Sequence, residues 1–311
     1  MNLVLGTMTF GPQVNRAESE AMLRRFLASG HREVDAAYVY NGGDTERILG
    51  EVFAQGGLPP CTVATKVNPR VTGRLDREAV LSQLDESLAR MKRDSVDVLY
   101  LHFPDPNTPV ETTLSACAEL HQQGKFKQLG LSNFAAWQVV DIWHLCQREG
   151  WPLPVVYQGL YNGLSRGIEP ELLPALRHLG MRFYAYNPLA GGILAGKYKD
   201  FSEEPAPGRF THRPNYRSRY WKKPFFDAVT ILTETCTAEG IPLVQAAYRW
   251  LAHHSGLDAA RGDAVILGAS SLAQLEQNLN AFDQQALPDS VVEAFEDAWL
   301  AAKPECPDYF R

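Results

Sequence analysis

The chain has 311 residues, of which 45% are hydrophobic, and its formal net charge at pH 7 is −6. An acidic chain gives no global electrostatic reason to expect nucleic acid or an anionic membrane surface as a partner. The sequence has no run of about 18 apolar residues, so we expect no transmembrane helix.

The cysteines are five in number, scattered, and without a CxxC pair. This usage argues against a disulfide framework and against a zinc site, and it suits a reducing cytosol. Cys61 and Cys117 fall in apolar runs and are expected to be inert core thiols. The first residues, MNLVLGTMTFG, lack the basic region of a signal peptide. We therefore expect no metal site and a cytoplasmic location.

Segments with the patterns of strands and of helices alternate along the chain. Strands are expected at residues 3–10, 31–35, 62–66, 96–102, 126–131, 155–158, 182–186 and 264–267. Helices are expected at residues 17–28, 45–53, 76–91, 109–123, 134–148, 170–178, 224–238, 243–253, 271–281 and 291–302. Thr45 and Asp76 are the expected N-caps of two of these helices. The segment from about Ala190 to Lys223 shows no clear period.

Eight expected strands, each followed by a helix, predict a (β/α)8 TIM barrel that forms a single domain over residues 1–311. A doubly wound sheet is the rival fold, but no GxGxxG follows the first strand, and Gly191-Gly192 comes only after a later one. An unpatterned segment as long as 190–223 is uncommon in a compact domain unless it is functional. We therefore expect it to form a loop over the mouth of the barrel.

Ionisable side chains come at the ends of three successive strands. Asp35 ends the strand at 31–35, and Tyr40 follows in the loop, while Lys66 and His102 end the next two strands. All strand ends of a parallel barrel meet at one mouth, where the active sites of this fold lie. The four side chains together make a proton-donor constellation. Taken singly, each has a plain structural interpretation as a turn residue, a loop aromatic, a solvated strand end or a satisfied polar group.

The order and setting of these four residues resemble the catalytic tetrad of the aldo-keto reductases. Four further segments resemble one branch of that family, the aflatoxin-aldehyde and succinic-semialdehyde reductases. They are FYAYNPLAGGILAGKY (183–198), YRSRYWKKPFF (216–226), LGASSLAQLEQNL (267–279) and ECPDYFR (305–311). The resemblance covers nearly the whole chain. It implies an NADPH-dependent reduction of small-molecule aldehydes or dicarbonyls to alcohols.

The resemblance gives each tetrad residue a role that its chemistry supports. Tyr40 would donate the proton to the carbonyl oxygen, and the Lys66 ammonium would stabilise the phenolate that remains. Asp35 would hold Lys66 through a charge-assisted hydrogen bond. His102 would orient the carbonyl and could relay a proton.

The resemblance also implies a binding site for NADPH/NADP+. Ser132, Asn133 and Gln158 would bind the carboxamide, because amide groups supply both donors and acceptors, and Tyr186 would stack on the nicotinamide ring. The loop residues Asn187, Pro188, Leu189, Gly191, Gly192, Leu194 and Lys197 would approach the pyrophosphate. Arg209 and Arg219 would favour NADP through its 2′-phosphate. Gly268, Ser270, Ser271, Gln274, Gln277 and Asn278 belong to the last barrel strand and the helix after it, whose N-terminus favours a phosphate.

Five residues are expected on the substrate side: Met8, Phe10, Tyr198, Tyr216 and Arg311. By resemblance, the C-terminal tail lies over the mouth, and Arg311 folds back to bind an anionic end of the substrate. This would favour carboxylate-bearing aldehydes such as succinic semialdehyde. The plain interpretation of a last residue is a frayed charged terminus.

Two other functions stay open. The first is a regulatory or channel-associated subunit of the same fold that binds NADPH but turns over slowly, which the intact tetrad disfavours. The second is a hydrolase or isomerase, which would need paired carboxylates or metal ligands at strand ends, and the sequence shows neither. Members of the branch are often dimers, so a homodimer is possible.

Overall fold

The computed structural model describes residues 1–198, 201–202, 204, 209–212, 214–282 and 284–311. Its centre is a closed barrel of parallel strands in the order β1 to β8. The strands are β1 (Asn2–Gly6), β2 (Glu33–Asp35), β3 (Thr62–Val67), β4 (Val96–Leu101), β5 (Phe126–Ser132), β6 (Pro154–Leu160), β7 (Arg182–Tyr186) and β8 (Ala264–Gly268). Leu5 of β1 pairs with Val34 of β2 and with Leu267 of β8, which closes the ring. The predicted (β/α)8 barrel is confirmed.

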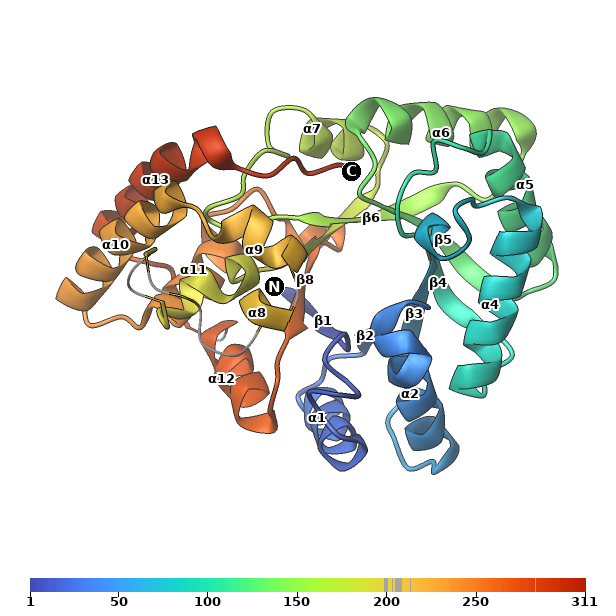
Figure 1. Ribbon diagram of the computed structural model, residues 1–311, viewed down its shortest axis with the longest axis horizontal. Helices are drawn as coiled ribbons and strands as arrows, with labels where there is room; N and C mark the ends of the chain where they lie inside the picture. The colour runs from blue at the N-terminus through green and yellow to red at the C-terminus, as the bar shows by residue number, and fades with distance from the viewer. Residues whose placement is uncertain (199–200, 203, 205–208, 213, 283) are drawn as a thin grey trace.

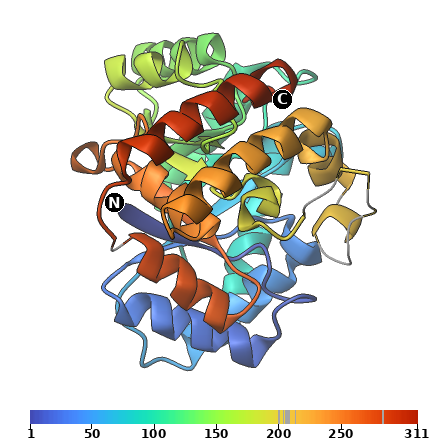
Figure 2. The same cartoon turned by 90° about the vertical axis from the view of Figure 1, so that its left-hand side faces the viewer.

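The helices surround the barrel, and they follow one another around it in chain order from α1 to α7 (Figure 1). They are α1 (Arg16–Ala28), α2 (Asp44–Ala54), α3 (Pro69–Thr72), α4 (Arg77–Met91), α5 (Val110–Gln122), α6 (Ala136–Glu149), α7 (Leu172–His178), α8 (Arg209–His212), α9 (Pro214–Tyr220), α10 (Lys223–Ala238), α11 (Leu243–His253), α12 (Leu272–Phe282) and α13 (Asp289–Ala302). Four short 3-10 helices are η1 (Tyr40–Gly43), η2 (Ala190–Ala195), η3 (Ala259–Arg261) and η4 (Lys303–Glu305). Figure 2 shows α10 and α13 side by side on one flank. No helix in the described ranges is long and apolar enough to span a membrane.

The barrel interior explains why the polar residues reach the mouth. Side chains two residues apart in a strand point to the same face. Ala64, Val98 and Tyr100 belong to a buried cluster, together with residues of β1, β6, β7 and β8. Lys66 and His102 each come two positions after a member of this cluster, and therefore continue the inward-facing row at the carboxyl end. The same spacing places Gln158 after Val156 and Tyr186 after Tyr184.

Tight packing in the barrel wall depends on a small residue. A Cβ on Gly130 of β5 would overlap the ring of Tyr100 on the neighbouring strand β4. The absence of a side chain on β5 therefore gives the Tyr100 ring its space. This ring belongs to the apolar cluster that precedes His102 along the barrel interior.

Two local predictions about helix ends have different outcomes. Asp76 is the N-cap of α4, where its side chain accepts a hydrogen bond from the Ala79 N–H at 3.0 Å, as predicted. Thr45 is not the N-cap of α2, because Gly43 takes that position with a φ of 91°. The Thr45 hydroxyl instead donates to the Phe10 carbonyl at 2.9 Å, which ties α2 to the loop after β1.

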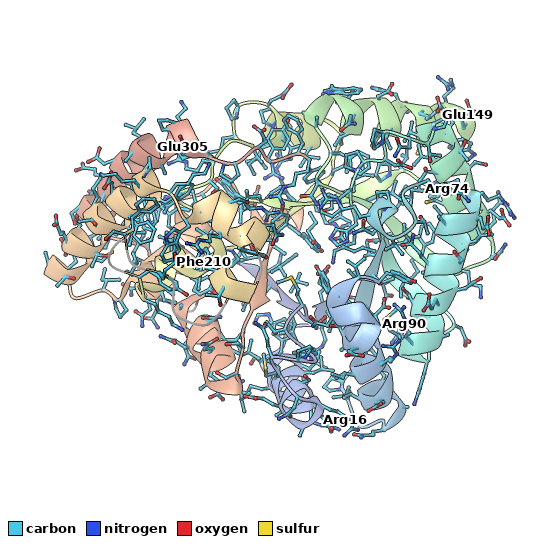
Figure 3. The ribbon with its side chains drawn as sticks, viewed as in Figure 1. Arg16, Arg74, Arg90, Glu149, Phe210 and Glu305 are labelled. Atoms are coloured by element: carbon cyan, nitrogen blue, oxygen red, sulfur yellow. The ribbon has the colours of Figure 1, made fainter. Side chains whose placement is uncertain are left out.

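The described residues of the segment at 190–223 form more helical structure than the sequence predicted. It contains η2, α8 and α9, although it shows no local period. An aromatic cluster around Trp221 holds these residues together. The centroid of the Trp221 ring lies 5.1 Å from that of Tyr198, 5.2 Å from that of Phe210 and 4.9 Å from that of Phe226. Figure 3 labels Phe210 within this region. These contacts join residues far apart in sequence, which is why periodicity does not reveal them.

Candidate active site

A cavity of about 1000 Å³ opens at the carboxyl ends of the strands. Most of the residues predicted for the site line it: Met8, Asp35, Tyr40, His102, Ser132, Asn133, Gln158, Tyr186, Asn187, Pro188, Leu189, Gly191, Gly192, Lys197, Tyr198, Tyr216, Arg219, Gly268, Ser270, Gln274, Gln277, Asn278 and Arg311. A cavity of this size is typical of sites that bind a small molecule or a cofactor.

Four predicted residues do not line the cavity, and a fifth cannot be placed. Lys66 is fully buried beside the cavity wall. Phe10 is also fully buried, because the loop after β1 folds back through the hydrogen bond from the Gly11 N–H to the Val14 carbonyl, so its predicted place at the mouth is wrong. Leu194 is buried in the core, and Ser271 caps the Gln274 N–H of α12. Neither lines the cavity. The side chain of Arg209 is outside the described residues.

Lys66 is the centre of the buried hydrogen-bond network. Its ammonium donates to both carboxylate oxygens of Asp35, at 2.7 and 2.6 Å, and to the Ala36 carbonyl at 2.6 Å. It also donates to the Tyr40 hydroxyl oxygen at 3.3 Å. Because an ammonium cannot accept, the phenol accepts this bond, and its own proton is not used in it. A cation is thereby fixed at the oxygen that would carry the charge of a phenolate.

Two opposing effects act on the pKa of Lys66. Burial lowers the pKa of Lys66 below its ordinary value, while the Asp35 carboxylate, through its charge and its hydrogen bonds, raises it. Burial is the larger effect. The carboxylate is held on its other side by Gln158, whose Nε2 donates to an Asp35 oxygen at 2.8 Å. Removing either member of the pair would leave an uncompensated charge in the barrel.

The loop that carries Tyr40 is fixed by Asn41. Asn41 has a φ of 51°, a left-handed conformation that Asn adopts more readily than most residues. Its Nδ2 donates to the carbonyls of Met8 and Phe10, both at 2.8 Å. The loop after β2 is thus bound to the loop after β1, which holds the Tyr40 ring at the mouth.

The hydrogen bonds of Asn68 define the protonation of His102. The Asn68 Oδ1 accepts from the Arg70 N–H at 2.9 Å, so its Nδ2 is the atom that faces His102 Nδ1 at 3.2 Å. An amide nitrogen donates, so Nδ1 accepts, and a neutral imidazole then carries its proton on Nε2. Gln83 of α4 holds the Asn68 backbone through two hydrogen bonds, at 2.8 and 3.2 Å. His102 is therefore set as a hydrogen-bond donor at Nε2.

The neutral state of His102 has a physical cause. Burial lowers the pKa of His102 well below its ordinary value of 6.5, and the nearby positive charges of Lys66 and Arg70 lower it further. Its imidazole is therefore uncharged at neutral pH. A neutral donor can bind a carbonyl oxygen without bringing a second full charge to the site.

One donor and one acceptor remain at the ends of β5 and β6. The Ser132 oxygen accepts from Asn133 Nδ2 at 3.0 Å, which leaves its hydroxyl proton to donate. Gln158 uses one N–H of its Nε2 on Asp35, and its Oε1 is the acceptor left for a ligand. A primary carboxamide needs this pair, because it both accepts and donates. Tyr186 donates to Asn133 Oδ1 at 2.7 Å, which fixes the ring at the cavity wall.

The glycines after β7 differ in what surrounds them. A Cβ on Gly191 would lie 2.8 Å from the Tyr220 ring, so this glycine permits the close packing of α9. Gly192, with a φ of 109°, has nothing within 4 Å on that side. The Gly192 N–H already donates to the Leu189 carbonyl at 2.8 Å. Lys197 and Arg219 bring positive charge to this part of the cavity.

The start of α12 presents side chains rather than bare amides. Ser270 donates to Gln274 Oε1 both from its hydroxyl at 2.8 Å and from its N–H at 3.0 Å. The Leu272 N–H donates to a carboxylate oxygen of Glu18 at 3.2 Å. The predicted phosphate site at this helix end is therefore partly capped from within the chain.

The C-terminal segment crosses the mouth and ends beside β5. Figure 1 shows it running from α13 toward α7. The Arg311 N–H donates to the Asn133 carbonyl at 3.0 Å, and the Tyr309 hydroxyl accepts from the Ala136 N–H at 3.1 Å. Arg311 lines the cavity, and its buried Nη2 has no hydrogen-bond partner among the described residues. The predicted fold-back of the tail is thus confirmed, and the plain interpretation of a frayed end is not.

Sequence reasoning missed Asn68 and Arg70, which both line the cavity. Asn68 is the N-cap of α3 and Arg70 lies within α3, a helix that the sequence did not predict. A signal was available, because Asn68 comes two residues after Lys66, in a loop at the carboxyl end of a barrel strand, where side chains often face the site.

Comparison with known proteins agrees with this geometry. The model of the Aldo/keto reductase family matches residues 2–300. The chain is 50% identical to Aflatoxin B1 aldehyde reductase member 2 of Mus musculus, over 99% of this chain and 87% of the relative. It is 48% identical to Aldo-keto reductase family 7 member A3 of Homo sapiens, over 99% of this chain and 96% of the relative. The resemblance found in the sequence is confirmed. The chain belongs to the aldo-keto reductase family of oxidoreductases, which generally use nicotinamide cofactors.

Proposed function

We propose that the protein reduces aldehydes to alcohols with NADPH, and that Tyr40 is the proton donor. The observation that carries this proposal is the buried Lys66 ammonium, 3.3 Å from the Tyr40 hydroxyl oxygen and paired with Asp35. This arrangement stabilises negative charge on the phenol oxygen. The relatives named as aflatoxin B1 aldehyde reductases support an aldehyde as the substrate class.

The chain's own residues supply the proton and the orientation. When bound, NADPH supplies the hydride that becomes the new C–H bond. His102 Nε2–H donates to the carbonyl oxygen and holds it near Tyr40. As the oxygen gains negative charge, the Tyr40 proton moves to it, and the phenolate that remains is stabilised by Lys66. One hydride and one proton together convert the aldehyde to a primary alcohol.

The residues around the cavity fit a nicotinamide cofactor. Ser132 and Gln158 offer the donor and the acceptor that a carboxamide needs. Tyr186 offers a flat ring beside them. Lys197 and Arg219 suit phosphates, and the sequence adds Arg209 to this group. An arginine fits the 2′-phosphate of NADPH through paired hydrogen bonds, so NADPH is favoured over NADH.

Arg311 supports a narrower substrate class. Arg311 lines the cavity, and its Nη2 is buried without a hydrogen-bond partner among the described residues. A buried donor without a partner is costly, and a carboxylate oxygen would satisfy it with a charge-assisted bond. We therefore favour carboxylate-bearing aldehydes such as succinic semialdehyde.

The free cysteines support a cytoplasmic location. Cys117 and Cys146 are buried in the core, and burial raises the pKa of each thiol to about 12. Thiols in this state are unreactive, and a chain that depends on no disulfide suits a reducing compartment.

The substitution Tyr40→Phe tests the donor role. It removes one oxygen and keeps the ring, so we expect kcat for succinic semialdehyde to fall about a thousandfold, within the range of acid–base catalysis. NADPH affinity, followed by quenching of protein fluorescence, should stay within twofold. Trp137→Phe on the surface of α6 is the control, because Trp137 is 68% exposed and does not line the cavity. Undiminished turnover in Tyr40→Phe would refute the proposal.

A further inference from the structure

Three flat groups follow one another at the β3–β4 side of the mouth. The guanidinium carbon of Arg70 lies 3.8 Å from the centre of the Phe103 ring. The Phe103 ring in turn stacks on the His102 imidazole, with centroids 4.8 Å apart and an interplanar angle of 19°. All three line the cavity. Stacking on an aromatic face orients a guanidinium and leaves its N–H edge available for an anion.

No acidic side chain neutralises Arg70 within the described part of the chain. The ion pairs found there include its neighbours Arg74, with Asp76 and Glu78, and Arg77, with Glu119, but not Arg70 itself. The acidic residues that line the cavity already have cations: Asp35 binds Lys66, and Glu204 binds Arg217. Arg70 therefore brings a net positive charge to the cavity of an acidic protein.

The position of Arg70 separates it from the residues that suit the phosphates. Lys197 and Arg219 belong to the segment after β7, and Ser270 follows β8. Arg70 follows β3, and in a closed ring of eight strands β3 and β4 lie across the mouth from β7 and β8. The anion that meets Arg70 is therefore one on the substrate.

Arg311 approaches the same side from the other direction. Its N–H bonds to the Asn133 carbonyl at the end of β5, and Asn133 Nδ2 donates to the His102 carbonyl at 2.9 Å. Arg70 is bound through its own N–H to Asn68, the residue that contacts His102 Nδ1. Arg70, after β3, and the Arg311 backbone, beside the end of β5, thus lie on the two sides of His102, and both residues line the cavity.

We propose that Arg70, held against Phe103, is a second anion-binding residue of the substrate pocket and that, with Arg311, it selects aldehydes carrying a carboxylate. The inference rests on the proposed aldehyde reduction. It adds a specificity-determining residue that does not take part in the proton transfer. A carboxylate presents two oxygens and can accept from both guanidinium groups at once.

Arg70→Gln tests this inference, and Arg74→Gln is the matched control. Arg74 lies between α3 and α4, is paired with Asp76 and is labelled near the start of α4 in Figure 3. The quantity measured is the ratio of kcat/KM for succinic semialdehyde to that for butanal, which has the same carbon number and no carboxylate. Loss of one charge-assisted contact should lower the ratio about tenfold in Arg70→Gln. Arg74→Gln should keep the wild-type ratio.

The outcomes separate the inference from the proposed function. If wild type reduces both aldehydes and Arg70→Gln keeps the wild-type ratio, the inference is overturned and the reductase stands. If wild type reduces neither aldehyde, the proposed function fails. The anion site is then tested by measuring the affinity for succinate by calorimetry. Succinate binding about tenfold weaker in Arg70→Gln than in Arg74→Gln supports the site, and equal binding in the two variants overturns it.

Discussion

The two sides of the cavity handle charge in opposite ways. On the side of β2 to β4, the Lys66 cation is bonded to Asp35 at 2.6 Å, and both are buried. On the side of β7 and the segment after it, Lys197 and Arg219 line the cavity without an ion pair among the described residues. The Asp35–Lys66 pair of the first side has its hydrogen bonds made inside the chain. The second presents its charges outward.

This difference matches what each side would do. A proton donor needs a fixed environment, because its efficiency depends on a tuned acidity and on the geometry of the transfer. A phosphate site needs positive charge that a ligand can neutralise. Substitutions of the buried Asp35–Lys66 pair should therefore affect the free energy of unfolding as well as catalysis. Substitutions on the second side should affect ligand affinity alone.

Lys66→Met would break the buried side most severely. It leaves the Asp35 carboxylate buried without its cation, so we expect the free energy of unfolding to fall by about 3–5 kcal/mol. Urea denaturation followed by circular dichroism measures the loss. The double variant Asp35→Asn/Lys66→Met should recover most of it, because the uncompensated charge is gone. A loss under about 1 kcal/mol in the single variant would contradict the role of the pair.

Asn68→Asp tests which ring nitrogen of His102 carries the proton. Aspartate keeps the oxygen that accepts the Arg70 N–H, but it replaces the donor at 3.2 Å from Nδ1 with an acceptor. The imidazole proton would then move to Nδ1, and Nε2 would lose its role as a donor. We expect kcat/KM to fall about thirtyfold.

The readout that separates this effect from a loss of structure is the nitrogen NMR spectrum of His102. It should show the proton on Nε2 in the wild type and on Nδ1 in Asn68→Asp. A reduced kcat/KM with an unchanged tautomer would show that Asn68 acts in another way.

Arg219→Gln tests the outward-facing side. Removing this cation should weaken NADPH binding about tenfold and leave NADH binding unchanged, because only NADPH carries the 2′-phosphate. Arg217→Gln on the same helix is the control, since Arg217 is paired with Glu204. Equal losses for the two cofactors would mean that Arg219 contacts a phosphate common to both. The free energy of unfolding should stay constant in both variants.

The smallest expected effect is the pH dependence of stability due to His102. Its pKa is lower in the folded protein than the ordinary value of 6.5, so the unfolded chain binds more protons in the window below that value. The free energy of unfolding should therefore decrease as the pH falls below about 6.5. Between pH 7.5 and 5.5, this contribution is at most about 1.4 kcal/mol, the value for an imidazole that stays neutral throughout in the folded state. His102→Gln should lose less stability than the wild type over this interval, and equal losses would contradict the shift.

The sequence predicts the positions of some residues of the cavity but not of others. Lys66 and His102 could be placed because the side chains alternate along a strand and all strands of a parallel barrel end at one mouth. The tail could be placed only through family resemblance. Phe10 could not be placed, because the hydrogen bond between Gly11 and Val14 reverses the loop and turns the side chain into the core. Backbone reversals of this kind leave no periodic signal.

The segment after β7 shows the same limit on a larger scale. Its helices depend on contacts between Tyr198, Phe210 and Trp221, which are separated in sequence by intervening polar residues. Arg70 was missed for a related reason. Its guanidinium stacks on Phe103, which follows the next strand, β4, and a single sequence does not reveal that contact.

The hydrogen bond between Gln158 and Asp35 has a consequence for which pyridine nucleotides the cavity would accept. Because Nε2 is committed to the carboxylate at 2.8 Å, the amide cannot rotate without losing that bond. The group presented to a ligand is thus an oxygen, which rewards an N–H and repels an anion. A pyridine nucleotide whose carboxamide had been hydrolysed to the acid would place a negative oxygen against it. Repulsion at Gln158 Oε1 would therefore weaken the binding of deamidated dinucleotides, even when their phosphates are the same.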